Sequence, residues 1–286
     1  MTLTDIAAPA ATANDAQALA VRVAALLPAR NDQPWTVEPY AAWWSTHPAA
    51  RLVQAERALI LVTGSGQTEV AWEAAGREAY EPDVRLASVA PELIAREVLR
   101  LVLPVLDDEA ASRARPGGRQ VIGRLQALHE IGWAIRERGP ATHNHVGLHA
   151  NSSVLAWGTP SGVRFAVSMH GTNPVCDVSV TGPVRAVERV LPLFLPMPGA
   201  ETPRYPLRRI RGRLLRRLAS HLVQFTAVDQ LQGEGGMAFG TGSGPYGYAA
   251  PALDPAARVR DSTPVSVDLH GVGIDLLLSR AGQLTR

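Results

Sequence analysis

Histidine is the residue type whose spacing most readily suggests chemistry in this chain. Five of the eight histidines, His129, His143, His145, His149 and His170, fall within one window of 42 residues. Residues two apart on an extended strand point to the same side, so His143 and His145 would face one way, and His149 could fold back toward them. Imidazole nitrogens bind zinc and similar divalent ions. The cluster therefore supports the hypothesis of a metal site at His143, His145, His149 and His170, and of a metal-dependent enzyme.

The surroundings of these histidines favour a different interpretation. No Asp or Glu lies between Glu137 and Asp177, so the cluster has no nearby carboxylate to act as a ligand, to orient a ligand or to accept a proton. The spacing matches no metallohydrolase signature. We therefore expect solvated loop histidines and no cofactor, and keep a zinc-like divalent metal as the alternative.

Arginine is concentrated in a second segment. Seven arginines occupy the 14 residues from Arg204 to Arg217. At about 100° per residue, Leu207, Ile210, Leu214 and Leu218 share one helix face, and Arg208, Arg209, Arg213 and Arg216 lie opposite. Such a helix could bind phosphate groups or an acidic partner, or it could simply present a solvated face. Stacking aromatic residues and a helix-turn-helix partner are missing, so nucleic-acid binding is the second functional hypothesis.

Other reactive side chains are few. Cys176 alternates with Val178 and Val180, which predicts a buried thiol. The chain has no lysine, because all 28 basic residues are arginine. The absence of lysine excludes Schiff-base enzymes, phosphate-binding loops of the Gly-Lys-Ser/Thr type and kinases of the usual pattern.

Most of the six tryptophans fall on expected strands, but Trp43-Trp44 does not and could form an exposed patch.

Composition places the chain among soluble globular proteins. It has 286 residues, of which 46% are hydrophobic and 19% charged. No apolar run approaches the roughly 18 residues that a membrane span needs, and the first dozen residues do not resemble a secretory signal. A single cysteine excludes an internal disulfide and is typical of a reducing compartment, so we expect a cytoplasmic protein. Residues 1–118 hold 10 arginines against 15 acidic residues, whereas the remainder is basic.

Two stretches of the sequence resemble each other and indicate a duplication. Residues 98–104 and 190–196 share five identities at an offset of 92, and each follows a matched proline, Pro91 or Pro183. Upstream, Thr46-His47, Leu59 and the turn at 63–66 match Thr142-His143, Leu155 and the turn at 159–162 at an offset of 96. The order holds although the offset drifts, which is typical of a duplicated module with small insertions.

The hydrophobic pattern predicts the same elements in each copy. In the first copy we expect a helix at 14–27, strands at 35–38, 58–62, 68–73 and 84–89, and a helix at 91–106. In the second we expect a helix at 119–131, strands at 133–136, 153–157, 164–169 and 175–180, and a helix from Pro183. Residues 207–225 predict a helix, residues 232–251 a mobile loop, and residues 265–279 a hairpin or one long strand.

The predicted fold class is thus α+β, with two tandem copies of an α-β-β-β-β-α two-layer sandwich built on antiparallel sheets, followed by a helix and β-hairpin segment. The expected boundaries are a flexible N-terminus at 1–12, repeats at 13–106 and 119–196, a linker at 107–118 and a basic segment at 197–286.

No convergent set of catalytic residues is visible, so we expect a non-catalytic, chaperone-like adaptor whose duplicated surface binds another protein. Polyanion binding through the arginine helix and histidine-dependent metal catalysis remain the alternatives.

Overall fold

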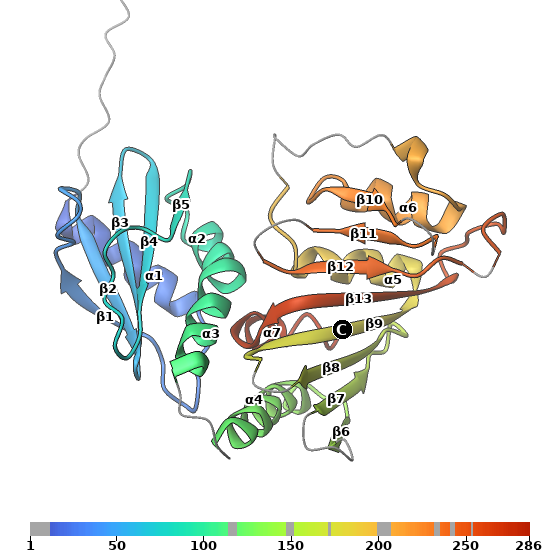
Figure 1. The fold of residues 1–286 in the computed structure, drawn as a ribbon, viewed down its shortest axis with the longest axis horizontal. Coiled ribbons are helices and arrows are strands. Elements are labelled where there is room, and N and C mark those ends of the chain that lie inside the picture. Colours follow the sequence, from blue (N-terminus) through green and yellow to red (C-terminus); the bar gives the residue numbers. More distant parts are fainter. Residues whose placement is uncertain are drawn as a thin grey trace, which may run out of the picture. The chain divides into compact units, whose positions relative to one another are not determined.

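A computed structural model of the chain describes residues 12–113, 119–146, 152–170, 173–198, 207–231, 235–240, 244–252 and 254–286. The chain divides into two compact units, residues 1–98 and 99–286. Each unit is an antiparallel sheet with helices packed against it (Figure 1). The α+β class and the antiparallel sheets are therefore confirmed. No helix within the described ranges is long and apolar enough to cross a membrane.

The first unit is a five-stranded meander in which neighbours along the chain pair in the order β1-β2-β3-β4-β5. Its elements are α1 (Ala13–Leu26), β1 (Thr36–Tyr40), β2 (Ala49–Gln54), β3 (Arg57–Gly64), β4 (Gln67–Glu73), β5 (Val84–Leu86) and α2 (Pro91–Glu97). Helix α1 begins with a capping box, because the Thr12 side chain accepts from the Asp15 amide while the Asp15 carboxylate accepts from the Thr12 amide. These hydrogen bonds lower the pKa of Asp15.

The two faces of this sheet differ in what covers them. Leu52, Leu59, Leu61, Val70 and Trp72 are buried and lie on the face against which α1 packs. The opposite face is covered by loops instead of helices. There, Ala42 and Ala79 from two loops close a small cluster over Ile60, Val62 and Ala71. The predicted alternation in β4 is confirmed, because Val70 and Trp72 share the helix-covered face.

The second unit contains an eight-stranded sheet in the order β10-β11-β12-β13-β9-β8-β7-β6. One half consists of α4 (Arg119–Arg136), β6 (Thr142–Val146), β7 (Ser152–Gly158), β8 (Arg164–His170), β9 (Val175–Pro183) and α5 (Val184–Val190), followed by the short turn η2 (Leu191–Leu193). The other half consists of the short turn η3 (Leu207–Arg209), α6 (Arg213–Leu222), β10 (Val228–Gln230), β11 (Met237–Phe239), β12 (Tyr246–Ala249), β13 (Pro264–Gly273) and α7 (Ile274–Arg280). Strands β9 and β13 pair antiparallel at the centre and join the two halves.

The helices cover one face of the large sheet. Val167, Val178 and Leu269 lie side by side on adjacent strands and are all buried. Helix α4 packs on the same face, since Gly132 lies against the Leu155 side chain. Cys176 is fully buried among these residues, which confirms that its thiol belongs to the core.

Several predicted elements differ from the observed ones. Strands β2, β6 and β10 were not predicted. Residues 133–136 are the end of α4 and not a strand, because Leu128, Ile131 and Ile135 follow the helical period and are buried together. The predicted loop at 232–251 contains β11 and β12. There, Gly247 lies so close to the Phe239 ring that a Cβ would meet it at 2.5 Å. The glycine therefore allows close packing between two strands and does not indicate a mobile loop.

The hairpin or long strand predicted at 265–279 is wrong for its second half, because β13 is followed directly by the helix α7. The remaining differences concern where elements end. The helix predicted at 91–106 continues from α2 through a π-helical turn, η1 (Val98–Val102), into α3 (Leu103–Arg113). Residues 107–113 of the predicted linker are therefore helical, and 114–118 lie outside the described residues. Pro104 has no backbone N–H to donate to the carbonyl of residue 100. This missing helical hydrogen bond favours the wider π-helical turn η1 just before it. The helix predicted at 207–225 is interrupted at Gly212, whose φ is +80°.

Both predicted repeats run helix, antiparallel strands, helix, but the first has five strands where four were predicted and the second has four. One matched sequence pair also differs in its position. Trp157 pairs with Thr142, whereas Leu61, its equivalent at an offset of 96, pairs with Ala50. Thr46-His47 precedes β2, and Thr142-His143 begins β6. These two Thr-His pairs therefore do not occupy equivalent positions. Descent of the segments from one module stays a prediction.

A hydrogen bond joins the C-terminal residues to β7 of the predicted second repeat, and its contribution to stability can be tested. The buried Trp157 indole N–H donates to the Leu284 carbonyl at 3.0 Å. We expect Trp157→Phe to lower the free energy of unfolding by about 1–3 kcal/mol, because it leaves a buried carbonyl without its donor. Denaturant unfolding measures this difference.

Trp133→Phe is the matched control. Trp133 is 57% exposed, and its N–H donates to the exposed Glu137 carboxylate. We expect a change within about 0.5 kcal/mol. Equal losses in the two variants would contradict the contact between the C-terminus and β7.

Candidate functional site

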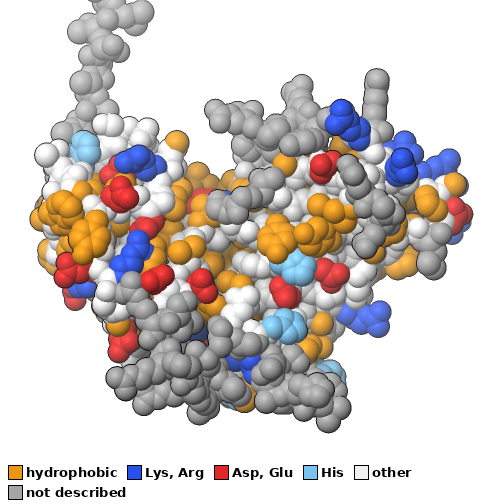
Figure 2. All heavy atoms as spheres, viewed as in Figure 1, with side chains coloured by type: hydrophobic (Ala, Val, Ile, Leu, Met, Phe, Trp, Pro, Cys, Tyr) orange, Lys and Arg blue, Asp and Glu red, His pale blue; other side chains and the backbone are white. Residues whose placement is uncertain are grey.

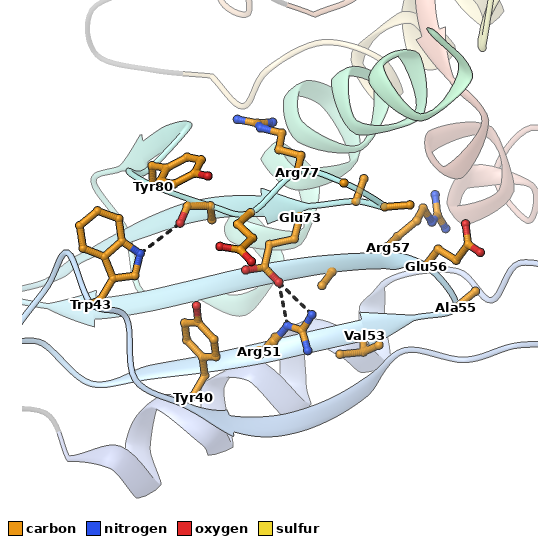
Figure 3. Close-up of a pocket in the computed structure, with 16 residues that line it drawn as sticks. Tyr40, Trp43, Arg51, Val53, Ala55, Glu56, Arg57, Glu73, Arg77 and Tyr80 are labelled. Atoms are coloured by element: carbon orange, nitrogen blue, oxygen red, sulfur yellow. Dashed lines mark hydrogen bonds and ion pairs between the residues drawn. The ribbon is translucent and has the colours of Figure 1, made fainter. Parts of the chain in front are cut away.

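The outer face of the five-stranded sheet, opposite α1, carries an open groove with a volume of about 970 Å³. Its floor is formed by β2 and β3. The turn at 55–57 and the segment at 74–80 flank it (Figure 3). We call it the outer-face groove. Tyr40, Trp43 and Tyr80 lie at one end, and Glu56 and Arg57 at the other.

An ion pair crosses the floor of the groove. Arg51 reaches over β3, and its Nε and Nη2 atoms lie 3.0 Å and 2.8 Å from Glu73 Oε2. A second carboxylate, Glu38 on β1, lies 3.4 Å from Arg51 Nη1. Ala58, between β2 and β4, is small enough to leave the path open. Because Arg51 is on β2 and Glu73 is on β4, the ion pair between them fixes the positions of both side chains.

The aromatic end is held by its own contacts. Trp43 is 70% exposed and Tyr80 is 66% exposed, yet the Trp43 indole N–H donates to the Ala79 carbonyl at 3.3 Å. Trp43 also meets Trp44 and Tyr80 edge to face, with centroids 6.0 Å and 6.3 Å apart. The exposed patch expected at Trp43-Trp44 is therefore confirmed for Trp43, whereas Trp44 is partly buried on the alanine-rich cluster.

The segment at 74–80 is fixed to the edge of the sheet by Arg77. Its guanidinium lies 3.3 Å from the centroid of the Trp72 ring and 2.8 Å from an Asp83 carboxylate oxygen. The other Asp83 oxygen accepts from the Trp72 amide. The wall of the groove therefore has a defined position.

The charges of Glu73 and Arg51 both affect the pKa of Tyr40. Burial raises the pKa of its hydroxyl, the negative charge of Glu73 raises it further, and the positive charge of Arg51 lowers it. The hydroxyl therefore stays neutral at ordinary pH and can donate a hydrogen bond to a ligand.

The arginines predicted to bind polyanions do not share one helix, because the break at Gly212 separates Arg208 and Arg209 in η3 from Arg213 and Arg216 on α6. Leu214, Leu215, Leu218 and Leu222 of α6 are buried, whereas Arg209, Arg213 and Arg216 are exposed. The backbone at Arg208 lies in η3, but its side chain is outside the described set. Polyanion binding at these arginines stays a prediction.

Arg217, on the same helix, serves the structure instead. Its guanidinium contacts Glu188 at 2.8 Å and Asp261 at 2.9 Å, and these contacts raise its pKa. Hydrogen bonds from Arg217 and then Arg185 lower the pKa of Asp261.

The predicted metal-binding histidines are only partly described. His149 and the His145 side chain lie outside the described residues. His143 is exposed on β6 in the row of Ala166, and His170 lies four residues further along β8, about 13 Å away along the strand. The structure does not bring these two together. Among the described residues, no group of three or more His, Cys, Asp or Glu is arranged to hold a metal.

Comparisons with known proteins add nothing to this description, because no family model, curated protein or solved structure matches the chain.

Because Glu73 and Arg51 shift the pKa of Tyr40 in opposite directions, removing either charge should change that pKa in a defined direction. We expect Glu73→Gln to lower the pKa of Tyr40 toward its ordinary value, because the variant removes a negative charge that disfavours the phenolate. Arg51→Ala should raise it, because the variant removes the positive charge. Tyrosine carbon shifts followed by NMR against pH measure both changes.

Tyr246 and Tyr248, in the other unit, serve as internal controls. The Tyr40 signals should change in both variants, while the signals of Tyr246 and Tyr248 stay as in wild type. Shifts of the same sign in the two variants would contradict the arrangement of the floor.

Proposed function

We propose that the chain is a non-catalytic adaptor or chaperone-like protein of the cytoplasm, and that its outer-face groove binds a segment of another protein. The exposure of Trp43 and Tyr80 beside a fixed ion pair is the observation that carries the proposal. Solvent exposure of two contiguous aromatic rings is unfavourable unless a partner covers them.

The residues of the groove are those that dominate protein–protein interfaces. Tryptophan, tyrosine and arginine contribute most to binding energy when they lie in a pocket that excludes water. Trp43 is already held by its hydrogen bond to Ala79, so little side-chain freedom is lost when a ligand packs against it.

The charged part of the groove favours binding over catalysis. Arg51, Glu38 and Glu73 satisfy one another, and no serine, cysteine or histidine is among the residues that line the groove in the described part of the chain. Catalysis that needs a serine or cysteine nucleophile, or a histidine as general acid or base, therefore lacks its residues here. The same charges, together with the neutral Tyr40 hydroxyl, suit the amide and carbonyl groups of a peptide backbone.

We further infer that the helix–strands–helix segments descend from one module. Three segments share this order of elements, namely residues 13–97, 119–190 and 213–280. Pro91 begins α2, and Pro183 directly precedes α5, so the prolines matched in the sequence stand at the start of corresponding helices. In each sheet the face opposite the helices is left for loops or partners, which gives the protein two related binding surfaces.

The decisive experiment compares two exposed tryptophans. Wild type, Trp43→Ser and Trp133→Ser are immobilised in parallel and exposed to extract of the source organism, and recovered proteins are identified by mass spectrometry. We expect at least one protein to be retained by wild type and Trp133→Ser and lost from Trp43→Ser. Its affinity for purified Trp43→Ser should fall about tenfold or more, the usual effect of truncating a central aromatic residue.

Thermal unfolding of each variant shows whether the fold is intact. Equal retention by Trp43→Ser and Trp133→Ser would show that the groove is not the contact. Recovery of no protein by wild type under gentle conditions would contradict the adaptor function itself.

A further inference from the structure

A second group of side chains gathers on the face of the large sheet that lies opposite its helices. Histidine, acidic and hydrophobic side chains lie together over these strands (Figure 2). The group comes from three neighbouring strands. We call it the tyrosine–aspartate patch, and its members are Asp177, Tyr246, Tyr248, Asp268 and His270.

The patch is held together by ring contacts and one hydrogen bond. The His270 Nδ1 atom lies 2.8 Å from an Asp177 carboxylate oxygen. The Tyr246 ring stacks on His270 with centroids 5.3 Å apart, and Tyr248 meets Tyr246 edge to face at 5.9 Å. His170, from the predicted metal cluster, lies 3.7 Å from the other oxygen of Asp177. The rings and Asp177 are therefore positioned without a ligand.

Asp268 and Tyr248 form the open part of the patch. They are directly opposite each other on β13 and β12, so their side chains are neighbours on one face. Their neighbours in the same row are small, Ala238 on one side and Ser179 on the other. Tyr248 is 39% exposed, Asp268 is exposed, and Asp268 has no ion-pair partner among the described residues.

The charge of this face is predominantly acidic. The same row continues to Asp229 on β10, so three carboxylates, Asp177, Asp229 and Asp268, lie on this face, on β9, β10 and β13. Within the described strands, Arg164 is the arginine on this face, and it lies two rows from Asp268, opposite Thr181. An accessible tyrosine ring beside an accessible carboxylate is the combination that binds a cationic nitrogen group.

We propose that the tyrosine–aspartate patch binds an arginine side chain of a basic peptide segment in a partner protein, with the guanidinium stacked on Tyr248 and paired with Asp268. Arginine fits better than lysine, because its planar group can stack on a ring and present two N–H donors to a carboxylate at once. The site lies in the second unit and does not depend on the outer-face groove of the first.

The test uses the full-length protein and a fluorescein-labelled peptide of alternating serine and arginine. Fluorescence anisotropy at fixed low salt gives the dissociation constant, and matched serine–lysine and serine–glutamate peptides are measured beside it. We expect the arginine peptide to bind most tightly and the glutamate peptide not to bind. Tyr248→Leu and Asp268→Asn should each weaken arginine binding about threefold, and the double variant about tenfold.

Each variant has a control that makes a matching change outside both surfaces. Trp133→Leu removes an exposed aromatic ring from α4, and Glu92→Gln removes an exposed carboxylate from the first unit. We expect both controls to bind the arginine peptide as wild type does. Thermal unfolding confirms that all variants are folded.

Several results would overturn the proposal. Equal weakening by the controls would indicate general attraction to acidic residues. Equal affinity for lysine and arginine peptides, together with no effect of Tyr248→Leu, would contradict stacking of the guanidinium on Tyr248. Concentration-dependent self-association that Asp268→Asn abolishes would assign the patch to a second copy of this chain.

Discussion

One constraint underlies the whole structure: each antiparallel sheet has helices on only one of its faces. Antiparallel sheets tolerate this, because their strands alternate between an apolar and a polar side. In the first unit, Leu59 and Leu61 face α1 while Ile60 faces the loops. In the second, Val178 faces the helices while Asp177 and Ser179 face away. Both candidate binding surfaces lie on the faces without helices.

The two faces are completed in different ways, and the difference follows from residue type. In the first unit, alanines at positions 42, 49, 71 and 79 let two loops settle onto the sheet, and Arg51 spans the remaining width to reach Glu73. In the second, the longer β9 and β13 carry serine, aspartate and histidine on this face, which stay hydrated, and tyrosines cover only part of it. The first surface is therefore a groove, and the second a patch on the sheet.

Local patterning was sufficient to predict most of the strands and helices but not their pairing. Strands β3, β4, β7, β8 and β9 carry strict alternation or an apolar run, and all five were predicted. Strand β2 was missed because Ala49-Ala50 has weak strand propensity and Gln54 looks like a turn residue. Gln54 is nevertheless buried, since its side-chain amide donates to the carbonyls of Pro28 and Gln33. The joining of β9 to β13 leaves no local signal, because it depends on pairing between segments about 90 residues apart.

The same distinction explains which parts of the candidate sites the sequence could reveal. The exposure of Trp43 was predictable, because Trp43-Trp44 lies outside any alternating segment. The Arg51–Glu73 pair was not, because its partners are 22 residues apart and meet only when β3 lies between them. Asp177 and His270, 93 residues apart, meet only because β13 inserts beside β9. Asp177 is the first carboxylate after the histidine cluster, and its 3.7 Å contact with His170 joins neighbouring strands. Its shorter contact, 2.8 Å to His270, involves a histidine outside that cluster and leaves no signal in the nearby sequence.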